Sequence, residues 1–291
     1  AGIYGNGASP DFIAEWAGCS VGQVDNSCKR VMVALLHLHD DAIRPPTEEE
    51  KEQAKRYAEA HTCHAWRNGY ISVDGTKVPL AFRPGRHGQA FFDKDRNYSF
   101  SVQLAVLLHN LLIVDYTIGH VGSVHDSTQF QDSRLSKARE EYLNDNEWIW
   151  ADSAYPLAFW CATPFRAPPG GELTLEQKRY NYWVSRLKGR FQFLKELQFP
   201  LQTEKQHRFM MMWQRCCLIL HNLIIRTAEE LGLSGGEWSS EVDAEHQDFE
   251  LGGEDEEEMD IDKNEIHNGH QFRQRLMRDL FRSEVYADRE L

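Results

Sequence analysis

The sequence predicts an α/β protein with a mixed sheet flanked by helices and an all-α unit at the N-terminal end. From residue 70 onward the expected elements follow the order strand, hairpin, helix, strand, helix, helix. An antiparallel start followed by alternating elements favours a mixed sheet. Hydrophobic residues make up 41% of the 291 residues, which is enough for a sizeable buried core.

The N-terminal unit, residues 1–46, has the pattern of a helix-turn-helix. Apolar residues recur at helical spacing on both sides of Gly18, which breaks the first helix, and Ser20 can cap the second. A DNA-binding module of this kind would present Lys29 and Arg30 on its exposed face. An ordinary helical hairpin that packs on the main domain explains the same pattern, so both interpretations stay open.

The main domain is expected over residues 70–232, after a helical connector at residues 47–69. The triple glutamate in the connector is typical of a solvated helix face. Hydrophobic periodicity and turn residues predict the elements of the connector and the main domain. These elements are a helix at 48–60, a strand at 70–74, a hairpin of 98–108 and 111–118, a helix at 125–139, a strand at 147–151, a helix that opens at Thr174, and a long helix at 205–230.

The net charge of −13 is concentrated in one segment. Residues 237–265 contain 14 acidic residues and one lysine, which accounts for the whole net charge and leaves the rest of the chain neutral. We therefore expect a disordered acidic tract at residues 233–268, followed by an amphipathic helix within residues 269–291. The tract is a solvated linker, a mimic of DNA, or a site for a basic partner, and the neutral body can still present a basic face to phosphates.

Two of the predicted strands end on an aspartate, Asp74 and Asp152, which lie 78 residues apart. Open α/β sheets place their sites at strand ends. Two carboxylates brought together repel each other unless a cation lies between them, and hard oxygen ligands select Mg²⁺ or Mn²⁺. Such a pair indicates metal-assisted phosphodiester chemistry. Aspartate is also a common turn residue after a strand, which is the competing interpretation for each one alone.

Other residue patterns argue against several classes of protein. No apolar run reaches the roughly 18 residues of a membrane span, and no secretory signal is visible. The six cysteines show no CxxC spacing, which is typical of reduced thiols in a cytoplasmic or nuclear protein. The Gly-x-Ser-x-Gly pattern occurs at Gly18-Cys19-Ser20-Val21-Gly22 and at Gly232-Leu233-Ser234-Gly235-Gly236, but neither follows a predicted strand, so neither indicates a nucleophile elbow. His61, Cys63 and His64 lack a second pair of zinc ligands at a supporting spacing, so we expect a packing role for them.

Six motifs in collinear order, from about Tyr70 to Arg226, resemble those of Harbinger-type DDE transposases. They are Val73-Asp74-Gly75-Thr76, Gly119-His120-Val121-Gly122-Ser123-Val124-His125-Asp126-Ser127, Ala151-Asp152-Ser153-Ala154-Tyr155-Pro156, Thr163-Pro164-Phe165 with Pro168-Pro169-Gly170-Gly171-Glu172-Leu173-Thr174, Leu187-Lys188-Gly189-Arg190-Phe191, and Cys216-Cys217-Leu218-Ile219-Leu220-His221-Asn222. Any one of them is unspecific, and their shared order is what carries the resemblance.

The resemblance implies an RNase H-like fold, a triad of two aspartates and a glutamate, divalent metal ions (Mg²⁺ or Mn²⁺), and cleavage and joining of DNA at transposon ends. Asp74 and Asp152 match the first and second acids. The family also implies a separate Myb-like DNA-binding protein as a partner and a nuclear location with a cytoplasmic pool.

The third acid of the family is missing from its expected place. The family has a glutamate between a Phe/Tyr-Asn-Tyr motif and the Leu-Lys-Gly-Arg-Phe motif, but Asn181 here precedes Lys188 by only seven residues, with no carboxylate between them. The nearest acids are Glu172, Glu176 and Glu196. Two hypotheses follow. The chain is either a metal-dependent DNA endonuclease or a non-catalytic, domesticated or decayed, DNA- or protein-binding module on the same fold.

Further residues are candidates for accessory roles. His125 and Asp126 can orient groups near a metal, or they can cap a helix. Lys188, Arg190 and Lys195 are candidates for phosphate contacts, and their spacing equally fits a solvated helix. Cys216, Cys217, His221 and Asn222 are expected in the core of the long helix.

Overall fold

The computed structural model describes residues 9–80, 82–94, 96–188, 201–232 and 263–283. Arg190 and Lys195, two of the predicted phosphate contacts, lie outside these residues, as does the side chain of Lys188. The predicted acidic tract, residues 233–268, lies outside them as far as residue 262. Its last residues, 263–268, are helical, which corrects the disorder predicted there.

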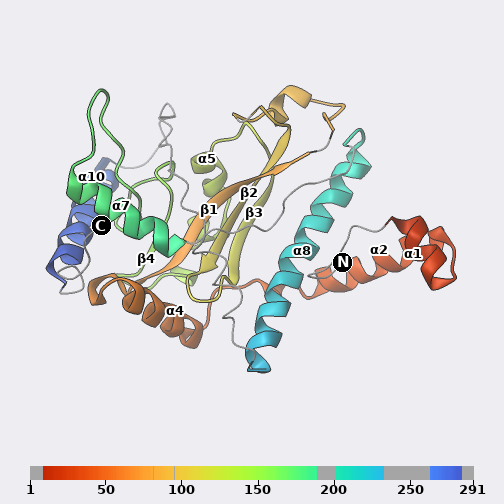
Figure 1. Cartoon of the computed structure of the whole chain (residues 1–291), viewed down its shortest axis with the longest axis horizontal. Helices are drawn as coiled ribbons and strands as arrows, with labels where there is room; N and C mark the ends of the chain where they lie inside the picture. Colours follow the sequence, from red (N-terminus) through yellow and green to blue (C-terminus); the bar gives the residue numbers. More distant parts are fainter. Residues whose placement is uncertain (1–8, 81, 95, 189–200, 233–262, 284–291) are drawn as a thin grey trace.

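The centre of the molecule is a five-stranded mixed sheet in the order β3-β2-β1-β4-β5 (Figure 1). β1 pairs antiparallel with β2, which pairs antiparallel with β3, whereas β4 runs parallel to both β1 and β5. The strands are β1 (Gly69–Pro79), β2 (Ser99–Leu107), β3 (Ile113–Val121), β4 (Trp148–Trp150) and β5 (Cys161–Ala162). This arrangement confirms the predicted mixed sheet and fits an RNase H-like fold.

Strand β1 is longer than predicted, which corrects the turn expected at Gly75-Thr76. The strand continues to Pro79 because β2 supplies a partner for every residue, and Asp74 pairs with Leu104 in the middle of the ladder. The short partner on the other side, β4, pairs only as far as Ser72. Asp74 therefore lies within β1, beyond the last residue that pairs with β4. The interpretation of Asp74 as a turn residue is wrong.

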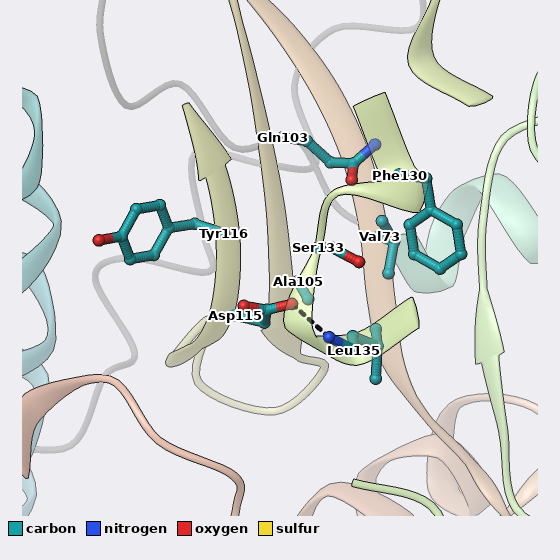
Figure 2. Close-up of a pocket in the computed structure, with 8 residues that line it drawn as sticks. All are labelled: Val73, Gln103, Ala105, Asp115, Tyr116, Phe130, Ser133 and Leu135. Carbon is teal, nitrogen blue, oxygen red and sulfur yellow. Dashed lines mark hydrogen bonds between the residues drawn. The ribbon is translucent and has the colours of Figure 1, made fainter. Parts of the chain in front are cut away.

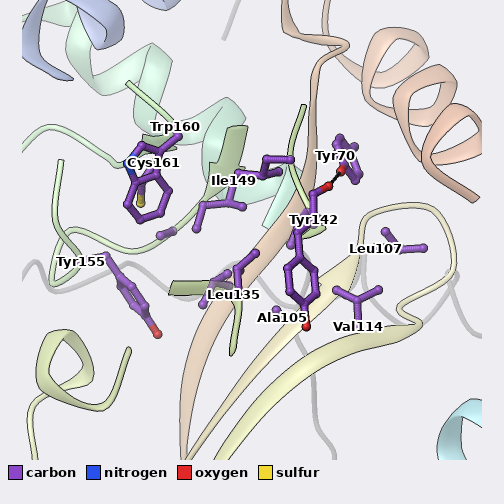
Figure 3. Packing of buried hydrophobic residues seen from close by; sticks show 14 of the residues in the cluster. Tyr70, Ala105, Leu107, Val114, Leu135, Tyr142, Ile149, Tyr155, Trp160 and Cys161 are labelled. Atoms are coloured by element: carbon purple, nitrogen blue, oxygen red, sulfur yellow. Dashed lines mark hydrogen bonds between the residues drawn. The ribbon is translucent and has the colours of Figure 1, made fainter. Parts of the chain in front are cut away.

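Helices cover both faces of the sheet. The long helix α8 (Glu204–Glu230) packs on one face, where Met210, Leu218 and Ile219 join a buried cluster with residues of β1, β2 and β3. The other face carries the short helices α5 (Asp126–Gln131) and α6 (Arg134–Lys137), whose Phe130 and Leu135 belong to a second cluster (Figure 3).

The helix predicted over residues 125–139 is broken into α5, α6 and the 3-10 turn η3 (Arg139–Glu141). The first piece ends at Gln131, and Ser133 caps the second, because its hydroxyl accepts the Ser136 N–H at 3.0 Å. The buried Asp115 carboxylate on β3 accepts the Leu135 N–H at 2.7 Å (Figure 2). A capping carboxylate from another element fixes this break, which periodicity alone does not reveal.

Helices α4 (Glu48–His61), α7 (Leu175–Lys188) and α10 (Lys263–Arg282) pack around the β4 side of the sheet. α10 extends the amphipathic helix predicted near the C-terminal end, and the Trp66 indole N–H in the 3-10 turn η1 (His64–Trp66) donates to the Leu276 carbonyl at 2.9 Å. The triple glutamate is not a wholly solvated face, because Glu50 completes a capping box with Thr47 and binds Arg44 with both oxygens.

The predicted N-terminal helices are present as α1 (Pro10–Ala17) and α2 (Val21–His37). Gly18 adopts a left-handed conformation between them, and the Ser20 hydroxyl caps α2 by accepting the Gln23 N–H at 3.2 Å. Both helices lie beyond α8 from the sheet (Figure 1), where the buried Cys216 thiol contacts the Met32 carbonyl. The short helix α3 (His39–Ala42) and the 3-10 turn η2 (Gly88–Phe91) complete the described elements.

Within the described residues, no helix combines the length and apolar character needed to cross a bilayer.

Candidate metal-binding carboxylate site

The two predicted aspartates occupy equivalent positions relative to the β1–β4 pairing, although Asp74 lies within β1 and Asp152 follows the end of β4. Ser72 of β1 pairs with Trp150 of β4, so Asp74 and Asp152 each follow the last paired residue by two positions. Neighbouring strands in a sheet are about 4.8 Å apart. The register therefore brings together two residues that are 78 positions apart in the sequence.

Each aspartate is held by the backbone that follows it. An Asp74 carboxylate oxygen accepts the Gly75 N–H at 3.1 Å, and an Asp152 oxygen accepts the Ser153 N–H at 2.6 Å. Asp74 is exposed and Asp152 is half-buried, so both carboxylates can reach a ligand from solvent. The turn after β4 is closed by the Tyr155 N–H, which donates to the Asp152 carbonyl at 3.1 Å.

A third carboxylate, Asp126, packs against Gly75 of β1, on the sheet face opposite the Asp74 side chain, because side chains alternate along a strand. It is the first residue of α5, and a Cβ atom built on Gly75 would lie only 2.6 Å from its Oδ1. Gly75 thus leaves the room in which this carboxylate packs. The predicted helix cap is not formed by its neighbour, because His125 at the N-cap position makes no side-chain capping hydrogen bond.

The Asp126 carboxylate is in an unfavourable environment for a charge. Its Oδ1 atom is buried without a hydrogen-bond partner, and the Lys77 ammonium is 3.9 Å away. Burial raises the pKa of Asp126, the negative charges of Asp74 and Asp152 raise it further, and Lys77 opposes the shift.

Two buried polar residues, Gln103 and Tyr155, connect Asp126 to the turn that follows Asp152. The Gln103 amide on β2 donates to the Asp126 carbonyl at 3.2 Å and to the Tyr155 hydroxyl at 2.7 Å. Figure 2 shows Gln103 on the sheet face that carries Val73 and faces Phe130. Burial raises the pKa of Tyr155 well above its usual value, and the Asp126, Asp74 and Asp152 charges add to the shift, so its hydroxyl stays protonated. Tyr155 belongs to one of the six motifs of the sequence, whereas no local pattern around Gln103 indicates a role in the site.

Cationic side chains lie beside the carboxylates. Lys77 donates to the Ser101 hydroxyl at 3.1 Å and to the Val124 carbonyl at 3.3 Å, and its position two residues beyond Gly75 puts it on the same sheet face. On the other side, the exposed Arg166 guanidinium donates to the Ser153 carbonyl next to Asp152. Period-2 alternation along β1 would have identified Lys77 if the strand had been predicted to its full length.

Helix α7 does not supply the expected third acid. Its residues 181–187 contain no carboxylate. Trp183, Val184 and Leu187 are buried in the hydrophobic cluster that contains the two tryptophans of β4. Asn181 binds the Phe165 backbone through both amide atoms, at 2.8 and 2.9 Å. Glu172 and Glu176 are exposed before or at the start of the helix, and Glu196 lies outside the described residues.

The remaining predicted residues lie elsewhere. Lys29 and Arg30 are exposed on α2, and Lys29 pairs with Asp25 at 2.5 Å. His61 and His64 contact the Tyr57 carbonyl and Glu59 respectively, and Cys63 is buried. In the C-terminal half of α8, Cys216 and Asn222 are buried, whereas Cys217 and His221 are half-buried.

The Asp74 and Asp152 carboxylates suit a hard divalent cation, because both present oxygen ligands that can be reached from solvent. The oxygens do not form a ready-made cage. In the part of the chain that the structure describes, no three His, Cys, Asp or Glu side chains are close enough together to hold a metal ion.

Comparison with known proteins identifies a family for the region that contains this site. Residues 73–222, just over half of the chain, match the family described as DDE superfamily endonuclease. A curated Arabidopsis thaliana protein named "Protein ALP1-like" is 26% identical over 161 residues, which cover 47% of this chain and 38% of that protein. The matched part is thus well under two thirds of that relative's length. No solved structure matches the chain.

The matched region begins one residue before Asp74 and ends at Asn222. It includes β1 from Val73 onward, the other four strands, Asp126, Asp152 and most of α8. The predicted resemblance to Harbinger-type DDE transposases is confirmed at this level, and the chain belongs to the family of DDE superfamily endonucleases.

Proposed function

We propose that the chain is a transposase-derived DNA endonuclease that uses a divalent cation, Mg²⁺ or Mn²⁺, held between Asp74 and Asp152. The observation that carries the proposal is the strand register, which aligns Asp74 in β1 with Asp152 after the adjacent parallel strand β4, within the matched endonuclease region. A carboxyl strand end that presents two oxygen ligands is a suitable place for metal-assisted phosphodiester chemistry.

The residues around the site have separable roles. Asp74 and Asp152 bind the cation, which when bound activates a water or hydroxyl and stabilises the leaving oxygen. Lys77 and Arg166 flank the carboxylates and are placed to neutralise DNA phosphates on either side. Tyr155 and Gln103 fix the backbone positions from which the carboxylates project.

Nicking of supercoiled DNA tests the proposal. Wild-type protein is expected to nick the plasmid in Mg²⁺ or Mn²⁺ and to stop when the metal is chelated. Asp74→Asn and Asp152→Asn should each lower the rate at least about 100-fold, because each removes a direct ligand of the cation. Asp145→Asn, in the exposed turn before β4, is the matched control and should cleave like the wild type. Equal cleavage by Asp74→Asn and the wild type would remove the assignment of Asp74.

The second candidate function is DNA binding without cleavage. The absence of a carboxylate from α7 residues 181–187 favours it, because two-metal catalysis depends on every ligand. In that case the protein shifts DNA in a gel but leaves supercoiled plasmid intact in either metal. The same two assays on one preparation separate the functions.

The proposal also includes contact with DNA, a nuclear location with a cytoplasmic pool, and a separate Myb-like partner. α1, α2 and the turn between them support a helix-turn-helix role for the N-terminal unit, with Lys29 and Arg30 exposed on the second helix. The DNA substrate follows from the endonuclease family and the flanking cations.

A further inference from the structure

Building on the proposed function, we propose that the loop between β1 and β2 binds single-stranded DNA. Residues 82–94 and 96–98 form this segment, called the β1–β2 loop below. It combines exposed aromatic rings with exposed basic side chains, which is the combination that proteins use to hold unpaired bases and their phosphates. This role rests on the proposed function and specifies the form in which the endonuclease engages its DNA.

The β1–β2 loop is basic, although the body of the chain is neutral. Between residues 82 and 98 the sequence has four lysine or arginine residues and two aspartates. The four basic residues and one histidine are exposed: Arg83, Arg86, His87, Lys94 and Arg96. Asp93 is buried and turned inward, since its carboxylate accepts the Asn97 N–H at 2.9 Å and the Ser99 hydroxyl at 2.6 Å. Within the described residues, no acidic side chain pairs with Arg83, Arg86 or Arg96, so these guanidinium groups are available to phosphates.

Two phenylalanines of the loop expose their rings among these cations. Phe82 is 55% exposed and Phe92 is 40% exposed, although burial of an aromatic ring is favourable. Phe92 contacts Tyr98 with ring centroids 5.4 Å apart, and the Arg83 guanidinium lies 5.9 Å from the centre of the same Tyr98 ring. Bases inside a duplex are already stacked on one another, whereas an unpaired base can stack on an exposed ring. The loop therefore favours a single strand.

Contacts with two other parts of the chain hold the loop in place. The Ala90 carbonyl accepts both the hydroxyl of Ser123, at 2.7 Å, and its N–H, at 3.3 Å. The Gly85 N–H donates to the Leu201 carbonyl at 3.1 Å, close to the start of α8, and Figure 1 shows the golden turn of the loop beyond the end of the sheet. A loop fixed in advance loses little conformational freedom when it binds a ligand.

A plain solvated loop explains these features less well. Surface loops are typically built from polar residues and glycine, and glycine is the usual residue at left-handed positions. Here Phe82 and Phe92 are exposed instead, and Arg96 has a left-handed φ of 64°. Backbone strain of this kind is concentrated at sites that bind ligands.

The loop begins within reach of the carboxylate site. β1 contains Asp74 and ends at Pro79, which is about 17 Å further along the strand. A DNA strand advances about 3.4 Å per nucleotide in a duplex, so this distance corresponds to about five nucleotides. Lys94 is near enough to affect the site electrostatically: burial raises the pKa of Asp126, and the Lys94 charge acts against that rise. A strand bound on the loop can thus extend to the two aspartates.

Fluorescence anisotropy of a labelled oligonucleotide tests the role of the rings. The single strand and its duplex are titrated with the full chain in the presence of a chelator, so that binding is measured without cleavage. Phe82→Ala should weaken binding of the single strand about 5-fold or more and change binding of the duplex less than about 2-fold, because only unpaired bases stack on the ring. Phe159→Ala is the matched control, since this ring is 47% exposed and lies beside Arg139 outside the loop. It should bind both forms like the wild type.

Two further variants separate stacking from charge and from folding. Phe82→Trp keeps an aromatic face and should retain wild-type binding of the single strand. Arg86→Ala should weaken binding of both forms and lower the slope of log affinity against log salt by about 0.7 for the single strand. Arg56→Ala on α4, where the side chain is 73% exposed, should leave that slope unchanged. Phe82→Ala should melt within about 2 °C of the wild type, because its ring is exposed.

The outcomes distinguish this inference from the proposed function. Wild-type affinity of Phe82→Ala for the single strand would overturn the role of the loop, and so would an equal loss for both DNA forms. Tighter binding of an RNA strand of the same sequence would overturn the choice of DNA. In these cases nicking of plasmid still tests the two-aspartate site by itself. A selective loss in Phe82→Ala, in a protein that nicks plasmid in neither metal, would support the loop and remove the endonuclease.

Discussion

At the scale of single residues, polar side chains that bind backbone atoms of distant elements hold the site's scaffold together. Asn222 on α8 is fully buried and spans three elements. Its amide donates to the Ala42 carbonyl at 2.8 Å and to the Ile113 carbonyl at 2.7 Å, and its oxygen accepts the Ile113 N–H at 2.9 Å. A core position was predicted for Asn222 from the apolar pattern around it, but these partners were not.

Asn222→Ala is expected to lower the free energy of unfolding by roughly 3 kcal/mol, because it leaves three buried backbone groups without a partner. Urea denaturation followed by tryptophan fluorescence measures the loss. Ile224→Ala on the same helix is the control, since its side chain is 46% exposed and its removal should cost under about 1 kcal/mol. Similar losses in the two variants would mean that the Asn222 hydrogen bonds contribute little.

At the scale of elements, the structure shows where sequence periodicity is sufficient and where it is not. α4 and α8 match the predicted ranges within one residue at each end, because each has a capping residue at its start and a continuous apolar stripe. β1 and the helix after β3 were mispredicted. The length of β1 depends on its partner β2, and the break in the helix depends on Asp115, both of which are non-local.

The docking of α10 provides a test at this scale. A Cβ atom on Gly269 would lie 2.6 Å from the Leu157 carbonyl oxygen, which is backbone and cannot move aside cheaply. Gly269→Ala should therefore destabilise the protein by about 1–3 kcal/mol, although alanine favours helices. We expect this variant to have a lower denaturation midpoint and to be cleaved faster by a protease on the N-terminal side of α10.

Gly22→Ala on α2 is the matched control, because nothing lies within 4 Å of its Cβ position. Only the higher helix propensity of alanine then affects stability, so the free energy of unfolding of this variant should be unchanged or higher by up to about 1 kcal/mol. A stabilised Gly269→Ala would show that α10 does not pack against Leu157 as described.

At the scale of the whole molecule, buried ionisable groups couple stability to pH. Burial lowers the pKa of His109 and His221, so both are neutral in the folded state. Burial alone would raise the pKa of Glu147, but hydrogen bonds from Lys55 and the Asn144 N–H hold it below its usual value. All three groups bind protons more readily in the unfolded chain, so all three contribute stability that is lost as the pH falls.

The histidine contribution can be isolated with one variant. In the unfolded chain a histidine takes up its proton near pH 6.5, so its contribution is lost as the pH falls below that value. His221→Gln can still donate to the Leu111 carbonyl, which His221 contacts at 3.0 Å. Between pH 7.5 and 5.5 this variant should lose less unfolding free energy than the wild type, by at most about 1.4 kcal/mol.

Denaturant titrations at the two pH values measure this difference, and His37→Gln, on an exposed position of α2, should retain the wild-type pH dependence. The Glu147 contribution is lost only at lower pH, below about 4.3, so it does not enter this window. A His221→Gln variant with the full wild-type slope would show that this buried histidine does not set the pH dependence.

The sequence by itself determined the class of the molecule and indicated two residues of the proposed site. Six collinear motifs identified the family, periodicity located most helices and strands, and Asp74 and Asp152 were recognised because strand-terminal carboxylates have a local signature. The sequence also showed that the third acid is absent from its expected place, because no residue between Asn181 and Lys188 carries a carboxylate.

The tertiary structure decided which side chains surround those two aspartates. Asp126 was recognised only as an accessory candidate, and its contact with Gly75 follows from the packing of α5 on β1. Gln103 and Lys77 join the site through the β1–β2 register, which aligns Gly75 with Gln103 and Lys77 with Ser101. Pairing between strands and packing of helices on them are set by the whole core, so no local pattern in the sequence encodes these neighbours.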